Sequence, residues 1–480
     1  MKKNGRQDSG QQHRSSRWMW VLMSTCALVI VIGLRHVPRP HEPVRPTNPP
    51  TADGTTEFTG VDAVRHAHQI PREPVLPPPT AEEIVAGKVN QFARSRRDIA
   101  RAIGRRAKRD VPPEVERFFD AVETGRWEEI EAQWNVLAKR SGQYEHSEHS
   151  PDLDLFWPAV LDAYGVAEQA HLWPAQKLLD YGNSILDSLR PGMVYVGGTD
   201  NGRWIPELLN ETSGEEPHII VTQNAFADGR YIDFMNTLYS DRFATLTSED
   251  SQRAFKEYIN DAQKRLQHDE QFPDEPKQVR PGESIQMVDG RVQVSGQVAV
   301  MSINEKLLQT LMQKNPELSF AMQESFPMSG TYASATPLGP IMELRAQGQD
   351  DQTAFTPERA TESLEYWRNR AQEILSDADP DNSESAPKSY SHDAVSAANL
   401  LAAHNFNAEA EEAYRLASQL WPANPESAGD LADLLARSGR EKEARQLLED
   451  FARQHPDERK SLERISGVWR MISGAQAGKP

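Results

Sequence analysis

The chain has 480 residues, 38% of them hydrophobic, a formal net charge of −18 at pH 7 and a single cysteine. One cysteine excludes an internal disulfide, so the folded part must be stabilised by its hydrophobic core. The acidic balance argues against nucleic acid as a partner, because a surface that binds nucleic acid needs an excess of positive charge.

The first segment has the pattern of a membrane anchor. Residues 1–17 are polar and basic, and residues 18–34 contain no charged side chain and are just long enough to cross a bilayer as a helix. A cleaved secretory signal is the alternative, but Arg35-His36-Val37-Pro38 stands where a small-residue cleavage site would be expected. We therefore expect an uncleaved single span in the inner membrane, with the tail in the cytoplasm and the bulk in the periplasm.

A proline-rich linker, residues 35–79, and a helical domain, residues 80–190, are predicted next. Proline favours an extended chain in the first, and Thr80-Ala81-Glu82-Glu83 resembles a capping box at the start of the second. A basic run between residues 94 and 109 could bind anionic lipid or nucleic acid, but we favour a solvated helix face. The Glu and His residues between 144 and 149 suit zinc but have no apolar frame, so we expect no metal site.

A Rossmann-like mixed α/β domain is predicted over residues 191–347. Residues 193–196 and 219–221 are short apolar runs rich in β-branched residues, and each precedes an amphipathic helical pattern. Strand–helix–strand units of this kind give parallel strands with a right-handed crossover. A hairpin around Asp289-Gly290, extended by residues 298–301, and strands over 318–326 and 341–344 complete the predicted domain.

Polar residues follow the first two predicted strands, at the edge where ligands bind in parallel sheets. The two loops are expected to form a crevice for a small polar guest, with Asp200 as a general base or metal-side carboxylate and Arg203 as an anion clamp. Alternatively, the glycines make a tight turn and Asp200 or Asn201 caps the helix. The candidate ligand-binding residues are Gly197, Gly198, Thr199, Asp200, Asn201, Arg203, Thr222, Gln223, Asn224, Asp228 and Tyr231.

Residues 356–470 have the pattern of tetratricopeptide repeats. Apolar and small residues recur 34 residues apart, as in the pairs Ala410/Ala444 and Pro422/Pro456. Asn405 and Gly439 fall in the turns between paired helices, where a left-handed backbone is needed. The predicted fold class is therefore α/β plus all-α, with an N-terminal membrane helix and C-terminal helical repeats.

The second half of the chain also resembles a known family. Gly197-Gly198-Thr199-Asp200, Thr222-Gln223-Asn224-Ala225, Ala227-Asp228 and Tyr231, followed by the repeats, look like the extramembrane part of bacterial multi-spanning membrane proteins related to protein O-mannosyltransferases. The resemblance covers residues 190–345 and the repeats. Because this chain has one predicted span, it lacks the membrane core for lipid-linked sugar chemistry, and the resemblance implies only a related, uncharacterised outer domain.

Two functions are compatible with these patterns. The first, which we favour, is a membrane-anchored, outward-facing scaffold that binds a protein partner through its repeats, with an α/β domain of unknown ligand. The second is an enzyme that acts on a sugar or a phosphorylated small molecule at the crevice between residues 197–203 and 222–224. No nucleotide-binding glycine motif, Walker lysine or Ser–His pair at recognisable spacing is present, so no cofactor is predicted.

Overall fold

The computed structural model describes residues 77–144, 147–198, 200–214, 216–280, 283–288, 291–345, 355–377 and 383–471. The predicted tail and anchor, most of the linker, Glu145, His146, Thr199 and the Asp289-Gly290 turn lie outside these residues. Within the described ranges, no helix has the length and apolar character of a membrane span, and no three His, Cys, Asp or Glu side chains are grouped to hold a metal ion.

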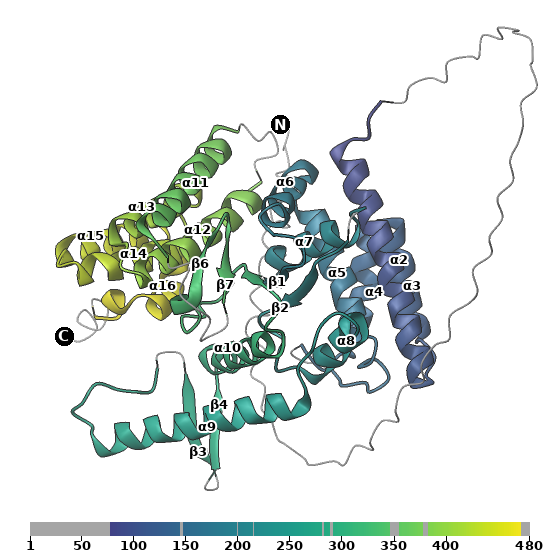
Figure 1. The fold of residues 1–480 in the computed structure, drawn as a ribbon, viewed down its shortest axis with the longest axis horizontal. Coiled ribbons are helices and arrows are strands. Elements are labelled where there is room, and N and C mark those ends of the chain that lie inside the picture. Colours follow the sequence, from purple (N-terminus) through teal and green to yellow (C-terminus); the bar gives the residue numbers. More distant parts are fainter. Residues whose placement is uncertain are drawn as a thin grey trace, which may run out of the picture. The chain divides into compact units, whose positions relative to one another are not determined.

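The first described part is helical, as predicted, and α2 begins directly after Thr80 (Figure 1). Gly125 adopts φ 70° and ends α3, so the chain reverses into α4. The prediction that the basic run is solvated is correct for Arg94, whose side chain is 66% exposed, and wrong for Arg96, which is fully buried. The helices are α2 (Ala81–Ala107), α3 (Pro113–Thr124), α4 (Trp127–Ala138), α5 (Trp157–Leu172) and α6 (Ala175–Leu186).

A five-stranded mixed sheet lies between these helices and the C-terminal ones, with strand order β2-β1-β5-β7-β6. β1 pairs in parallel with β2 and β5, and β7 pairs antiparallel with β5 and β6. Both β1 and β2 are buried throughout, which explains why their sequences are continuous apolar runs. The strands are β1 (Val194–Gly197), β2 (Ile219–Thr222), β5 (Phe320–Met322), β6 (Ala335–Leu338) and β7 (Ile341–Leu344).

The helices of the α/β region follow the strands as expected, with two corrections. Residues 298–301, predicted to extend the hairpin, form the first turn of α10, which begins after Gly296 at φ 98°. The edge strand β6 was not predicted. A separate hairpin of β3 and β4 packs on α9. These elements are α7 (Asn201–Glu211), α8 (Gly229–Tyr239), α9 (Ser248–Gln271), β3 (Ser284–Val288), β4 (Arg291–Ser295), α10 (Gln297–Lys314) and the 3-10 turn η1 (Tyr332–Ser334).

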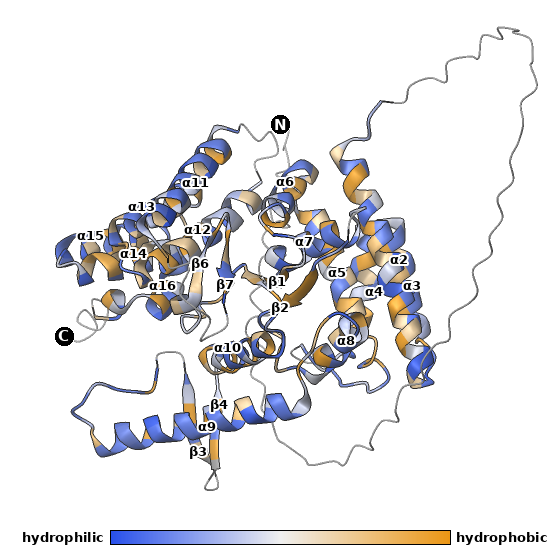
Figure 2. Cartoon of the chain, in the orientation of Figure 1, coloured by the Kyte–Doolittle hydropathy of each residue, from blue (hydrophilic) through white to orange (hydrophobic). Residues whose placement is uncertain are grey.

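The helix α7 packs closely against α5 and α6 because glycine replaces a side chain at each crossing. A Cβ atom at Gly165 would lie 2.1 Å from the Trp204 ring, and one at Gly182 would lie 2.5 Å from Leu209. The polar and apolar faces of the helices alternate accordingly, with apolar residues toward the sheet and the neighbouring helices (Figure 2). One hydrophobic cluster includes buried residues from Val85 to Trp469.

The repeats form two stacked helical hairpins, α12–α13 and α14–α15, as predicted. Asn405 and Gly439 occupy the two inter-helix turns with φ 65° and 77°. The preceding helix α11 packs on α13, and the last helix, α16, packs on α14. The helices are α11 (Pro357–Ser376), α12 (Ser385–Ala403), α13 (Asn407–Leu420), α14 (Pro425–Arg437), α15 (Glu441–Gln454) and α16 (Arg459–Ile465), with the 3-10 turn η2 (Pro456–Glu458) before α16.

The packing of the first repeat leads to a testable prediction. Ala410 is fully buried at the crossing of α12 and α13, whereas Ala408 on the same helix is exposed. We expect Ala410→Leu to lower the free energy of unfolding by about 1–3 kcal/mol through overpacking. The control Ala408→Leu should change it by less than about 0.5 kcal/mol. Urea unfolding of both variants measures the difference, and equal midpoints would show that this crossing is assigned incorrectly.

Candidate functional site

The turn between β1 and α7 has an unusual backbone. Asp200 adopts φ 50° and ψ −116°, outside the left-handed helical region, and such a conformation costs about 1–3 kcal/mol for a residue with a Cβ. The carbonyl of Asp200 accepts hydrogen bonds from the N–H groups of Arg203 and Trp204, at 3.1 and 2.8 Å, and so starts α7. Its side chain makes no capping hydrogen bond, so the expectation that the Asp200 carboxylate caps the helix is wrong.

Gly198 and Gly202 allow this turn to lie against the end of β5. A Cβ atom at either position would lie 2.1 Å from Oε1 of Gln323. The Tyr195 hydroxyl, on β1, donates a hydrogen bond of 2.6 Å to the carbonyl of Gly202. The predicted role of these glycines in a tight strand-to-helix turn therefore agrees with the structure.

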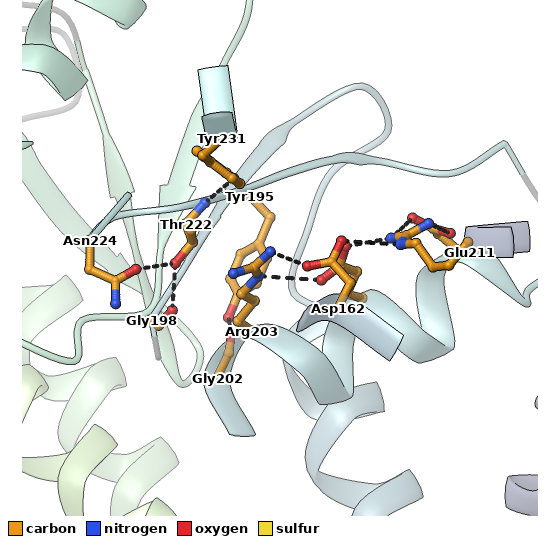
Figure 3. Close-up of polar contacts among 11 residues, drawn as sticks. Asp162, Tyr195, Gly198, Gly202, Arg203, Glu211, Thr222, Asn224 and Tyr231 are labelled. Atoms are coloured by element: carbon orange, nitrogen blue, oxygen red, sulfur yellow. Dashed lines mark hydrogen bonds and ion pairs between the residues drawn. The ribbon is translucent and has the colours of Figure 1, made fainter. Parts of the chain in front are cut away.

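The loop after β2 is bonded directly to this turn (Figure 3). Thr222 Oγ1 lies 3.0 Å from the Gly198 carbonyl and 2.8 Å from Asn224 Oδ1. The Tyr231 hydroxyl accepts a 2.8 Å hydrogen bond from the Thr222 N–H. The two predicted loops therefore meet at the carboxyl edge of the sheet. Asp228 instead caps α8, where it accepts from the N–H of Arg230 at 2.9 Å.

Arg203 points away from this edge into a buried ionic network (Figure 3). Its guanidinium pairs with Asp162 and lies 3.5 Å from Glu207. Asp162 also lies 3.1 Å from Nε of Arg96, which pairs with Glu207 and Glu211 at 2.6 Å each. Because Arg203 already has two carboxylate partners, this placement does not favour the anion-clamp role.

The charges in this network do not cancel, since two arginines face three carboxylates. Burial and the neighbouring Glu207 raise the pKa of Asp162 to about 7, although Arg203 and Arg96 act in the opposite direction. The network joins α2, α5 and α7 through side chains that are almost completely removed from water. Its evident role is structural, and it fixes the helix that follows the candidate turn.

Residues that sequence reasoning missed surround the Asp200 side chain. Glu168 on α5 and Lys388 on α12 are close enough to interact with it electrostatically, as is Tyr144. Burial raises the pKa of Asp200 to about 6, opposed by Arg203 and Lys388. Burial also raises the pKa of Glu168 to about 7, with Asp200 and Glu131 adding to the shift and the hydrogen bond from Tyr164 opposing it.

The first repeat helix is attached to the same edge of the sheet. The carboxylate of Asp393 on α12 is 1% exposed and accepts from Nε2 of Gln323 at 2.5 Å and from the Tyr181 hydroxyl at 3.1 Å. The Asn201 amide donates in turn to the Tyr181 hydroxyl at 3.1 Å. Helix α12 therefore supplies part of the wall around the β1 turn.

The described residues also enclose two small hollows away from this turn. One is lined by residues of α10, η1 and β7, including Met312, Thr331 and Leu344. The other is lined by apolar side chains that include Phe226 and Leu311, together with the candidate residue Tyr231. Neither includes a residue of the turn itself.

Comparison with known proteins supports the repeats. A family model described as tetratricopeptide repeat matches residues 400–463, which cover α13, α14 and α15. No curated protein and no solved structure matches the chain. The comparisons thus give no support to the resemblance to the O-mannosyltransferase-like family, while the repeats and their association with protein–protein interaction stand.

Proposed function

We propose that this chain is a membrane-anchored scaffold that faces the periplasm and binds a protein partner through its tetratricopeptide repeats. The match over residues 400–463 is the observation that carries the proposal, since stacked repeats of this kind form extended surfaces for protein partners. The charge-free run at residues 18–34, with its basic flank, supports the anchor. The buried contact of Asp393 supports a rigid attachment of the repeats to the α/β region.

The surface proposed for the partner is a polar stripe on the first helices of the repeats, formed by Lys388, His392, Glu426 and Asp430. Nδ1 of His392 lies 2.8 Å from Glu426, and the two side chains remain 36% and 40% exposed. The Lys388 ammonium lies 4.7 Å from the centre of the Trp421 ring. Burial and the nearby Glu426 and Asp433 raise the pKa of Asp430 to about 8. The stripe therefore offers charged groups of both signs to a polypeptide.

Site-specific photo-crosslinking in cells tests this surface. A photoreactive residue at His392 or Glu426 should give a discrete protein adduct, because both positions lie on the polar stripe. The matched controls are Lys442 and Arg445, which are exposed on the second helix of a repeat. Equal adducts at all four positions, or adducts only at the controls, would contradict the assignment.

The alternative function, an enzyme acting on a small polar molecule, keeps one specific observation in its favour. Gly198 and Gly202 flank Asp200 in a strained strand-to-helix turn, and enzymes use such turns to expose a reactive side chain. Of the two guests considered, a phosphorylated compound fits less well than a sugar, because Arg203 is already paired with Asp162. This alternative rests on the turn alone and not on the repeats.

A further inference from the structure

The β1 turn gathers hydrogen-bond acceptors that lack donors. Gln323 is 95% buried, and its Oε1 lies against the turn without a hydrogen-bond partner among the described residues. Gln223, fully buried at the end of β2, has the same unpartnered Oε1. Unmatched acceptors of this kind are rare in protein interiors, and each one calls for an explanation.

Both glutamine amides are held in place by their own donors. Nε2 of Gln323 donates to Asp393 at 2.5 Å, and Nε2 of Gln223 donates to the Gln323 carbonyl at 2.9 Å. The backbone N–H groups of the same residues bond to β1, at Val196 and Gly197. The orientation of each amide is therefore fixed, and the oxygens cannot exchange places with the nitrogens without breaking these bonds.

The two carboxylates beside the turn also lack a cation that is bonded to them. In the part of the chain that the structure describes, no group donates a hydrogen bond to the Asp200 carboxylate, and Glu168 accepts only from the Tyr164 hydroxyl, at 3.0 Å. Arg203 is committed to Asp162, and Lys388 lies over Trp421. Asp200 and Glu168 therefore face each other across a site rich in acceptors.

We propose that this turn binds the primary ammonium group of a ligand, held between the carboxylates of Asp200 and Glu168. An ammonium group supplies three donors and one positive charge, so it matches both the missing donors and the unbalanced charge. A metal ion is a poorer match, since no three metal-ligating side chains are grouped in the described ranges. An anion at the start of α7 would have to approach two carboxylates. The site extends beyond the proposed scaffold, because it lies outside the repeats.

Calorimetric titration of the full chain in detergent tests the site with defined probes. Cadaverine represents a free amine, and a blocked Gly-Lys-Gly peptide represents a lysine of a protein partner. The neutral isostere pentanediol, methyl glucoside, inorganic phosphate and Ca²⁺ are the comparisons. Binding of either amine probe, and not of the neutral isostere, supports the proposal. Equal binding of pentanediol, or binding of glucoside, phosphate or Ca²⁺ without binding of either amine, overturns it.

Charge-removing variants identify the residues. Asp200→Asn and Glu168→Gln should each weaken amine binding by about tenfold or more, since each removes one charged acceptor and preserves shape. Asparagine tolerates a positive φ as well as aspartate does, so the turn should persist. Asp180→Asn, at an exposed carboxylate on α6, is the control and should leave binding unchanged. Undiminished binding in both site variants sinks the assignment. Loss of peptide crosslinking to the repeats with intact amine binding affects only the scaffold proposal.

The pH profile gives a second readout. The charged and titratable groups around Asp200 are Arg203 on α7, Glu168 and Tyr164 on α5, Glu131 on α4, Lys388 on α12, and Tyr144. With the pKa of Asp200 near 6 and that of Glu168 near 7, both carboxylates ionise between about pH 5 and about pH 8. Amine binding should therefore strengthen as the pH rises over this range, and Asp200→Asn should flatten the profile. A profile that weakens toward high pH contradicts the proposal.

Discussion

Replacing Arg96 by methionine is expected to lower the free energy of unfolding by about 3–5 kcal/mol. Arg96 is fully buried and bonds to Asp162, Glu207 and Glu211 at 3.1, 2.6 and 2.6 Å. Methionine fills much of the same volume but leaves three carboxylates around an apolar side chain, with only Arg203 to compensate them. The cost arises from the carboxylates that remain, so it exceeds the cost of a typical core substitution.

The control for this variant lies on the same helix. Arg94 pairs with Glu123 at 3.2 Å, but its side chain is 66% exposed, so Arg94→Met should change the free energy of unfolding by no more than about 1 kcal/mol. Urea unfolding followed by far-ultraviolet circular dichroism measures both variants. Similar losses for the two would mean that the buried network contributes no more than a surface ion pair.

Replacing Gly165 by alanine should destabilise the chain by about 1–3 kcal/mol, because the new methyl group overlaps the Trp204 ring at 2.1 Å. Gly87 on α2 provides a control of opposite sign. No atom lies within 4 Å of a Cβ placed there, so Gly87→Ala should stabilise the helix by about 0.5–1 kcal/mol. Thermal unfolding should therefore shift in opposite directions. Stabilisation by both substitutions would show that α5 and α7 do not cross as closely as described.

Local pattern was sufficient to predict the central strands and the repeats. β1 and β2 are buried on both faces and are unbroken apolar runs, and the small residues of the repeats recur at a fixed spacing. β6 was missed because Pro337 interrupts any strand pattern, and proline is tolerated there only because β6 is an edge strand. Residues 298–301 were misassigned because four β-branched or small apolar residues suit either a strand or the first turn of a helix.

The candidate site shows the same division. Asp200, Thr222 and Asn224 were predicted because each follows the end of a parallel strand, and the two loops are in fact bonded together. Gln323 directly follows β5, so the same rule, applied to that strand, would have found it. Glu168 and Lys388 had no local signal, because α5 and α12 reach the turn only through tertiary packing. The partner of Arg203 could not be predicted, since Asp162 lies 41 residues earlier in the chain.

The buried carboxylate of Asp393 joins the repeats to the end of the sheet through Gln323, whose other amide atom faces the β1 turn. Occupancy of the turn and occupancy of the repeats would therefore be coupled through one amide group. Thermodynamic reciprocity then applies: if a ligand at the turn changes the affinity of the repeats for their partner by some factor, the partner changes the affinity of the turn by the same factor. On this view the chain is a two-input device, in which each occupant reports on the presence of the other.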